Sequence, residues 1–320
     1  MSIAEEEQVV LAARDGDERA FGELAERYRP ELRVLCYRML GSLDEAEDLV
    51  QDTYLRAWRA RDTFRLEGRW SFRAWLYRIA TNACLNALSR SPLRKVLPAQ
   101  LGAAGDPSEP VAPPVELPWL QPFPDDLLAA SDPEEIVVAK ESIELAYLAA
   151  IQHLPPRQRA ALILREVVGW SAKDVAALLE TTDAAVASAL QRARATMPSR
   201  SASRPSTAEE REVLRRYMDA HERADISALA ALLREDAIAE MPPIPTWFDG
   251  REAILTATAR GFQTIGPVRF IATHANGRPA AACFANGRPF SLDLLRIERG
   301  QIAEITSFGP DTFRFFEELT

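Results

Sequence analysis

Ten prolines fall between residues 92 and 133, and this density decides how the rest of the chain can fold. Proline fixes φ and lacks an amide proton, so neither a continuous helix nor a central strand can run through such a segment. The segment is also acidic and shows little hydrophobic periodicity, as a linker does. The chain therefore divides here into parts that must each build a core of their own.

An apolar island interrupts the linker, with the sequence Leu117-Pro118-Trp119-Leu120-Gln121-Pro122-Phe123-Pro124. A pure spacer has no need of aromatic side chains such as Trp119 and Phe123, because exposing them to water is unfavourable. We therefore expect part of the linker to dock on another part of the protein.

The ninety residues before the linker show helical periodicity. Apolar residues at helical spacing predict an amphipathic helix over residues 43–61. Ser42 offers the N-cap of this helix, and Gly41 ends the preceding helix over residues 18–40. Another helix is expected over residues 70–89.

Helical patterns resume after the linker and are punctuated by capping residues. Ser171 is the expected cap of one short helix, and Thr182 or Asp183 is the expected cap of the last one. Short helix, tight turn and second helix fit a helix-turn-helix. The expected helices cover residues 133–152, 156–168, 172–179 and 183–197.

The final 115 residues change class. Helices are expected first, and strands follow that are separated by Asn276-Gly277 and Asn286-Gly287, the favoured pairs of tight hairpin turns. Arg299-Gly300 makes a third turn. The pattern predicts an antiparallel meander with helices on one side, an α+β domain. The expected divisions are residues 1–92, the linker 93–132, residues 133–198, a second linker 199–206, and residues 207–320.

Charge is distributed unevenly along a chain whose net charge is −9. Residues 53–95 carry nine Arg and one Lys against two acids, and residues 151–204 are also basic, with a net of +4. The stretches that flank residues 53–95 are acidic. Two basic zones in an acidic chain suggest two separate contacts with a polyanion. Solvated helix faces explain most charge runs, but not so few acids across forty-three residues.

Composition places the chain among soluble globular proteins. The acidic N-terminus lacks an apolar run, so we expect no signal peptide, no membrane span and a cytoplasmic location. The cysteines are few and far apart, which favours buried free thiols over a disulfide framework. Neither CxxC nor HxxxH spacing occurs, so we expect no metal and no cofactor. The three cysteines are Cys36, Cys84 and Cys283.

Residues 42–58, SLDEAEDLVQDTYLRAW, resemble the helix of extracytoplasmic-function (ECF) sigma factors that grips the clamp of RNA polymerase. The match is dense and without gaps. Its exposed face could pair with charges on a partner helix. The resemblance implies a core-polymerase contact through Asp48, Gln51, Asp52 and Arg56.

Residues 72–82, FRAWLYRIATN, look like the sigma helix that reads the −10 promoter element. Opening a duplex requires a place for an unstacked base and cations for the backbone, and aromatic and basic residues alternate here. The family's base-capturing loop maps to residues 64–71. Trp75, Leu76 and Ile79 are better explained as core. The expected DNA contacts are Trp70, Arg73, Tyr77, Arg78 and Asn82.

Residues 154–194 resemble the −35-binding domain of the same family. A recognition helix places its N-terminal part in the major groove, and basic residues lie on the flanking phosphates. This chain has Ala187-Ser188-Ala189 in the middle of that helix, where a lysine and an arginine are common. The expected DNA contacts are Ser171, Lys173, Ser188, Gln191, Arg192 and Arg194.

The C-terminal residues, with LLREDA at 232–237 and WFDGREAI at 247–254, resemble SnoaL-like domains, which have a cone-shaped fold that encloses a pocket. With the linker island, the arrangement looks like the sigma-G-type ECF factors of actinobacteria. A core histidine with a satisfied hydrogen bond is the better explanation of His221 and His274 than catalysis. The residues considered for a pocket are Tyr217, His221, Trp247, His274 and Asp293.

The resemblance therefore implies a sigma subunit and not an enzyme, with core RNA polymerase and promoter DNA as its partners. ECF factors are usually two-domain proteins restrained by an anti-sigma factor, and the sequence itself does not indicate one. The cone domain is expected to regulate the helical domains in cis. The alternatives are a bifunctional protein whose cone domain binds or transforms a small molecule, and a dimeric helix-turn-helix regulator.

Overall fold

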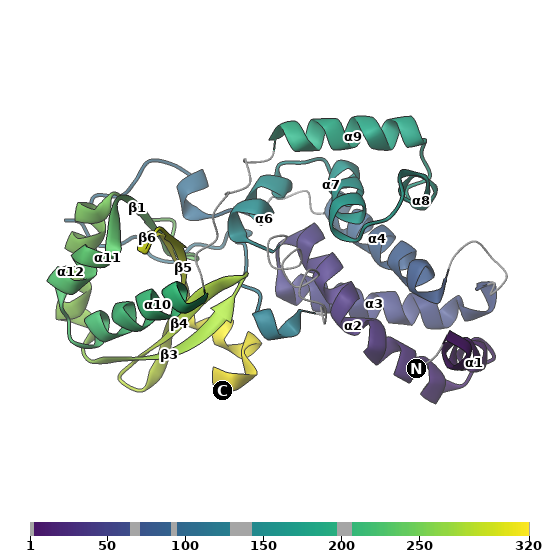
Figure 1. The fold of residues 1–320 in the computed structure, drawn as a ribbon, viewed down its shortest axis with the longest axis horizontal. Helices are drawn as coiled ribbons and strands as arrows, with labels where there is room; N and C mark the ends of the chain where they lie inside the picture. Colours follow the sequence, from purple (N-terminus) through teal and green to yellow (C-terminus); the bar gives the residue numbers. More distant parts are fainter. Residues whose placement is uncertain (1–2, 65–70, 91–94, 129–142, 197–206, 320) are drawn as a thin grey trace. The chain divides into compact units, whose positions relative to one another are not determined.

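The chain forms two compact units (Figure 1). The helical unit contains the described residues up to residue 90, residues 127–128 and residues 146–196. The C-terminal unit contains residues 95–126, 143–145 and 207–319. A computed structural model describes residues 3–64, 71–90, 95–128, 143–196 and 207–319.

The ends of the first helices are set by local capping. The Ser42 hydroxyl accepts a hydrogen bond from the Glu45 amide at 3.2 Å and so satisfies a first-turn donor. Gly41 has a φ of 71° and donates its amide to the Tyr37 carbonyl. Both predicted caps are confirmed. The elements are α1 (Ile3–Arg14), α2 (Glu18–Leu40), α3 (Leu43–Arg59), η1 (Arg61–Thr63) and α4 (Phe72–Arg90).

The second half of the helical unit contains the predicted helix-turn-helix. The hydroxyls of Ser171 and Thr182 each accept a first-turn amide at 3.1 Å, from Asp174 and Ala185, and so cap the two helices. The expected residues 133–142 of the first helix lie outside the described residues. The elements are α6 (Leu145–Gln152), α7 (Pro156–Leu162), the π-helical turn η4 (Ile163–Val167), α8 (Ala172–Leu178) and α9 (Asp183–Thr196).

A buried arginine fastens α7 to α2. Arg159 is only 3% exposed, and it donates to the main-chain carbonyl of Met39 and to Gln152 Oε1, the latter at 2.7 Å. The carbonyl of Met39 lies in the last turn of α2, where carbonyls have no partner within the helix. Because a buried charge without partners is costly, these bonds hold the two halves of the helical unit together.

The C-terminal unit is built on one six-stranded sheet with the order β2-β1-β6-β5-β4-β3. Helices α10 and α12 pack against it, α10 on β3 to β5 and α12 on β1 and β2 (Figure 1). The elements are α10 (Thr207–Glu222), α11 (Ile226–Leu232), β1 (Leu233–Glu240), β2 (Trp247–Asp249), α12 (Arg251–Ile265), β3 (Val268–Ala275), β4 (Arg278–Ala285), β5 (Arg288–Glu298), β6 (Gln301–Phe308), η5 (Pro310–Phe315) and η6 (Glu317–Leu319).

The meander is as predicted, but the whole sheet is mixed. Asn276-Gly277 and Asn286-Gly287 have φ between 52° and 75° and form the predicted turns. Strands β3 to β6 pair antiparallel, and the sheet as a whole is mixed because β1 pairs in parallel with β6. That pairing joins strands at opposite ends of the domain sequence, so no local turn signals it.

Residues 95–126, called the linker strap below, belong to the C-terminal unit. The strap contains η2 (Pro98–Gln100), and η3 (Asp125–Leu127) begins at its end. The Phe123 amide donates to Asn276 Oδ1 at 2.8 Å, and the Phe123 carbonyl accepts the main-chain amide of Asn276 at 2.9 Å. The ring of Phe123 is fully buried, and Trp119 is half-buried. The prediction that the apolar island docks is confirmed.

Replacing Phe123 with Ala should release the strap. Loss of a fully buried phenyl ring costs about 3–5 kcal/mol in protein cores. Leu117→Ala in the same segment should change stability by less than ~0.5 kcal/mol, because Leu117 is 41% exposed. Hydrogen exchange of strap amides measures the free energy of local opening. Equal effects of the two substitutions would contradict this account of the strap.

Candidate functional site

The exposed face of α3 carries the residues predicted to bind core polymerase. Asp48, Gln51 and Arg56 are exposed, and Asp52 is half-buried beside Arg56, with 2.6 Å between Oδ2 and Nη2. The opposite face is buried and holds α3 in the helical unit through Leu43, Ala46, Val50, Thr53, Tyr54 and Ala57. The four predicted residues therefore share one accessible stripe.

Leu55 lies in the same stripe and was missed from the sequence. It is 56% exposed, more than any other large hydrophobic side chain among the described residues. Its position four residues after Gln51 and three after Asp52 places it on the same helix face. An apolar side chain with charged neighbours is the usual composition of a protein-binding surface.

The residues predicted for the −10 element on α4 are engaged within the helical unit. Arg73 Nε lies 2.5 Å from Glu31 Oε2, and its guanidinium lies over the Tyr77 ring, 4.8 Å from the centroid. The Tyr77 hydroxyl donates to the same Glu31 oxygen at 2.9 Å. Burial raises the pKa of Tyr77, and the Glu31 carboxylate adds to this effect. Glu31 therefore holds two of the predicted DNA contacts in place.

The −35 segment covers part of this α4 surface. The rings of Tyr77 and Trp170 are 5.6 Å apart, and Tyr77 is only 3% exposed. Arg78 Nη2 lies 3.2 Å from Glu180 Oε1, while Asn82 is exposed. Trp70 lies outside the described residues. The burial of Tyr77 corrects the expectation that its ring is open to DNA in this arrangement.

Among the predicted −35 contacts of the helix-turn-helix, one side chain caps a helix and others are exposed. Ser171 is the N-cap of α8, so its hydroxyl is occupied by the Asp174 amide, and Lys173 is exposed. On α9, Gln191 is exposed and Arg192 Nη1 donates to Ser188 Oγ at 2.5 Å. The exposed faces of α8 and α9 therefore offer polar and basic groups.

Arg194, at the C-terminal end of α9, is paired across the unit. Its Nε lies 2.6 Å from Glu166 Oε1, and its side chain remains 65% exposed. A phosphate oxygen could replace the carboxylate, because exposed ion pairs are weak. The sequence alone did not reveal this competing partner.

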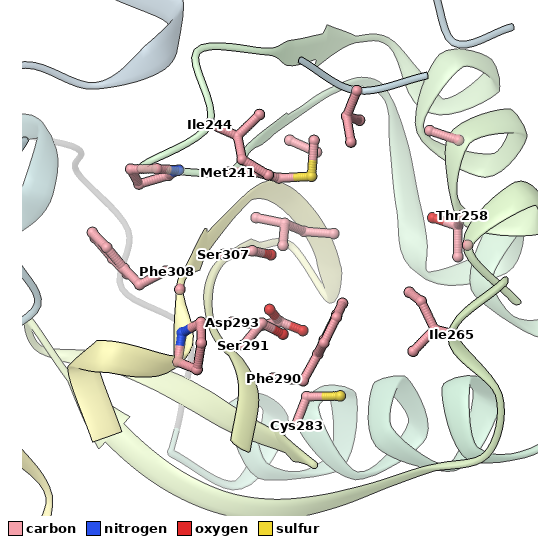
Figure 2. A pocket seen from close by; sticks show the side chains of 18 of the residues that line it. Met241, Ile244, Thr258, Ile265, Cys283, Phe290, Ser291, Asp293, Ser307 and Phe308 are labelled. Atoms are coloured by element: carbon pink, nitrogen blue, oxygen red, sulfur yellow. The ribbon is translucent and has the colours of Figure 1, made fainter. Parts of the chain in front are cut away.

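A cavity of about 1110 Å³ opens between the sheet and α12 in the C-terminal unit (Figure 2). Side chains of β1, β5, β6, α10 and α12 form most of its wall. The remaining side is made by the linker strap, whose contributions are Pro110, Val111, Pro114, Trp119, Leu120 and Gln121. The cavity is mostly apolar, as ligand sites are.

Three of the five predicted pocket residues line this cavity. Tyr217, His221 and Asp293 face it from α10 and β5. The indole of Trp247 instead donates to the Gly102 carbonyl at 3.0 Å and so holds the strap. His274 is exposed on the edge strand β3. The structure therefore does not place Trp247 or His274 in the cavity.

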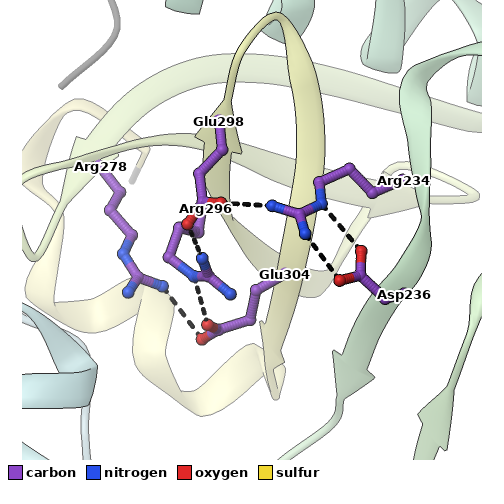
Figure 3. A network of polar contacts seen from close by, with 6 residues as sticks. All are labelled: Arg234, Asp236, Arg278, Arg296, Glu298 and Glu304. Carbon is purple, nitrogen blue, oxygen red and sulfur yellow. Dashed lines mark hydrogen bonds and ion pairs between the residues drawn. The ribbon is translucent and has the colours of Figure 1, made fainter. Parts of the chain in front are cut away.

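The other face of the same sheet carries an ion-pair network (Figure 3). Glu304 on β6 is bonded by Arg278 at 3.1 Å and Arg296 at 2.8 Å. Burial opposes ionisation of this carboxyl, but the two guanidiniums prevail and lower its pKa to about 2. Further pairs extend the network through Glu298, Arg234 and Asp236.

Glu240 lies on this face too, but there burial outweighs the groups that favour its ionised form. Its carboxylate accepts the Ala99 amide of the strap at 3.0 Å, and it is 6% exposed. Burial raises its pKa to about 7, and the nearby Glu304 adds to the shift. The strap is thus attached to an acid that titrates near neutral pH.

Within the described ranges, no helix is long and apolar enough to cross a membrane. The described residues also contain no group of three or more His, Cys, Asp or Glu side chains placed to hold a metal ion. Cys36, Cys84 and Cys283 are free and buried, as predicted.

Three segments of the chain match known families. Residues 24–92 match Sigma-70 region 2, residues 144–197 match Sigma-70 region 4, and residues 214–305 match the SnoaL-like domain. The first two contain α3, α4, α8 and α9, and the third contains most of the sheet. These matches, together with a relative named as an ECF RNA polymerase sigma factor that aligns with 95% of this chain at 42% identity, show that the chain belongs to the extracytoplasmic-function family of RNA polymerase sigma factors.

One relative that aligns with nearly the whole chain is the ECF RNA polymerase sigma factor SigG of Mycobacterium tuberculosis. It is 42% identical over 322 residues, which cover 95% of this chain and 86% of the relative. The sigma-E factor of Escherichia coli is 31% identical over 58% of this chain and 88% of its own length. The crystal structure of M. tuberculosis SigJ is 22% identical, with a TM-score of 0.62 over 92% of this chain and 98% of SigJ, and so shares the fold.

The stability of the C-terminal unit should fall as pH rises through neutrality because of Glu240. A carboxyl whose pKa is raised on folding stabilises the folded state while protonated, and this contribution is lost above the folded value of about 7. Glu240→Gln should remove the loss. Urea midpoints compared over roughly pH 5 to 8 measure it.

Glu235→Gln, at a position whose side chain is 89% exposed on the same strand, should keep the pH dependence of the unmodified protein. Parallel pH profiles for Glu240→Gln and the unmodified protein would show that another group is responsible.

Proposed function

We propose that this sigma factor binds core RNA polymerase through the exposed stripe of α3. The observation that carries this proposal is the stripe itself, Asp48, Gln51, Asp52 and Leu55, on a helix inside the region 2 match. The stripe combines charge for orientation with one apolar contact. Proteins similar to this chain are named as RNA polymerase sigma factors, which supports polymerase as the partner.

Promoter DNA is the second proposed partner, bound at two elements. Arg73, Arg78 and Asn82 on α4 would contact the −10 element, with Trp70 and Tyr77. On the −35 element, Gln191 and Ser188 would face base edges while Arg192, Arg194 and Lys173 contact phosphates. Ser171 would act through its cap on α8, which sets the position of the following residues.

The contacts between the two halves of the helical unit imply a closed form. Tyr77 is covered by Trp170, and Arg78 is paired with Glu180, so the −10 surface is incomplete while region 4 lies on it. Binding promoter DNA through both elements therefore requires the halves to separate. DNA would favour the separated form because only that form offers both surfaces.

The C-terminal unit would act in cis by restraining this separation. The chain between regions 2 and 4 passes through the strap, which is fastened at Gly105, Val115 and Phe123 to the C-terminal unit. A fastened strap leaves less free chain between the two regions than a released one. The C-terminal unit would thereby favour the closed form.

Charge reversal on α3 tests the polymerase contact. Asp48→Arg with Asp52→Arg should weaken binding to core polymerase by at least about tenfold, because repulsion replaces attraction across the interface. The fold should be kept, since these side chains are not buried. Fluorescence anisotropy of labelled protein against core polymerase measures the affinity.

Glu18→Arg with Glu23→Arg on α2 is the matched control, with the same charge change at exposed positions. Unchanged polymerase affinity in the α3 variant, or an equal loss in the control, would remove α3 from the proposed interface.

Release of the strap tests the action in cis. Phe123→Ala should raise run-off transcription severalfold, because the halves of the helical unit separate more easily once the strap is free. Leu117→Ala is the control and should transcribe like the unmodified protein. Equal transcription by all three proteins, with strap release verified by hydrogen exchange, would refute regulation through the strap.

A further inference from the structure

The cavity of the C-terminal unit is large and ends on a buried acid. Its volume of about 1110 Å³ exceeds the range of roughly 300–1,000 Å³ usual for small-molecule sites. Ser291, Asp293 and Ser307 meet on its wall, where β5 and β6 lie side by side (Figure 2). Apolar side chains such as Met241, Ile244 and Phe290 surround them.

One carboxylate oxygen of Asp293 accepts a hydrogen bond, and the other has no donor among the described residues. Oδ2 accepts the Tyr217 hydroxyl at 3.0 Å. Oδ1 is buried and has no hydrogen-bond partner among the described residues, although Asp293 as a whole is only 5% exposed. A buried acceptor without a donor costs about 1–3 kcal/mol, and more when it is charged. The cavity beside it is the place from which a donor can come.

His221 adds a second acceptor to the same end of the cavity. Its Nδ1 lies 3.0 Å from the Tyr217 carbonyl, which can only accept, so Nδ1 carries the proton and Nε2 has a free lone pair. Burial lowers the pKa of His221, which keeps the ring neutral at pH 7. The polar end of the cavity therefore presents two acceptors, Asp293 Oδ1 and His221 Nε2, beside the hydroxyls of Ser291 and Ser307.

The cations of the cavity wall are used elsewhere. Arg260 donates to the carbonyls of Pro107 and Glu109 in the strap. Arg314 lies over the ring of Phe315, 4.9 Å from its centroid. Neither guanidinium is directed at Asp293 by these contacts, so an anionic ligand would meet an uncompensated carboxylate.

We propose that this cavity binds an apolar compound that carries one hydrogen-bond-donating head group, an ammonium or a hydroxyl, seated on Asp293 Oδ1. The ammonium is favoured over the hydroxyl because it also neutralises the carboxylate. The apolar body of the ligand fills the space between α12 and the sheet and reaches the strap residues Trp119 and Leu120.

Binding would also hold the strap, since the strap is one wall of the cavity. Ligand contact with Val111, Trp119 and Leu120 exists only while the strap is docked, so the ligand stabilises the docked strap. This consequence rests on the proposed regulation in cis. The binding does not, and its failure would leave the promoter and polymerase contacts untouched.

Four pyrene compounds that differ only in their head group test which ligand head group the full-length protein prefers. They are 1-pyrenemethylamine, 1-pyrenemethanol, 1-methylpyrene and 1-pyrenecarboxylate, titrated by fluorescence anisotropy. The amine should bind at least about tenfold more tightly than the methyl compound, the alcohol should lie between them, and the carboxylate should bind most weakly.

Asp293→Asn should abolish the preference of the amine over the methyl compound. The matched control is Asp311→Asn, which makes the same change at an exposed residue of the same cavity wall and should keep the preference. Should Asp293→Asn fail to fold by circular dichroism, the order of the four probes on the unmodified protein still decides. Equal affinities, a preferred carboxylate, or no binding at roughly 100 μM would overturn the proposal.

Hydrogen exchange tests separately whether a bound ligand stabilises the docked strap. The amides of Gly105 and Val115, which donate to the carbonyls of Trp247 and Pro243, should exchange at least severalfold more slowly with the amine bound. Binding without slower exchange would keep the ligand site and overturn its link to the strap.

Discussion

The reciprocal pair of hydrogen bonds between Phe123 and Asn276 is the contact on which the organisation of this protein depends. Both main-chain groups of one linker residue are satisfied by one residue of a hairpin turn, and the phenyl ring beside them is fully buried. The prolines of this segment interrupt the run of amides that a helix or a strand ladder needs, so the segment forms little regular structure of its own. It takes its structure from the sheet, and in doing so it closes the cavity and makes the linker part of the C-terminal unit.

The two faces of the sheet show how strand alternation separates two kinds of chemistry. On β5 and β6, Asp293 and Ser307 are opposite one another and face the cavity, while Arg296 and Glu304 are opposite one another in the ion-pair network. Glu304 has two cations and stays ionised. Asp293 accepts a hydrogen bond from one hydroxyl, that of Tyr217, and borders the cavity. Acidic residues therefore stabilise the fold on one face of the sheet and line the proposed ligand site on the other.

Local signals in the sequence predicted most of the helices and turns. Ser42, Gly41 and Ser171 act through hydrogen bonds to residues within four positions, so their roles are visible without the fold. Contacts between distant residues could not be predicted from the sequence, such as the parallel pairing of β1 with β6 and the packing of Trp170 against Tyr77. The exposed position of His274 on an edge strand could not be predicted either, because it depends on the order of the strands. The α3 stripe was predicted except for Leu55, because an apolar residue is assigned to the core by default.

The pentapeptide Ala-Asn-Gly-Arg-Pro occurs twice, ten residues apart, and its two copies form the same kind of turn but bond different segments. Each asparagine adopts a positive φ at a hairpin turn. The side chain of Asn276 clasps the linker, whereas the side chain of Asn286 donates to Ile265 at the end of α12. A glycine would serve either turn equally well but would lack the side-chain oxygen that accepts the Phe123 amide and the side-chain amide that donates to Ile265. In this chain the asparagine that forms each turn therefore also bonds a neighbouring segment. Asn276 bonds the linker strap to the sheet, and Asn286 bonds the end of α12.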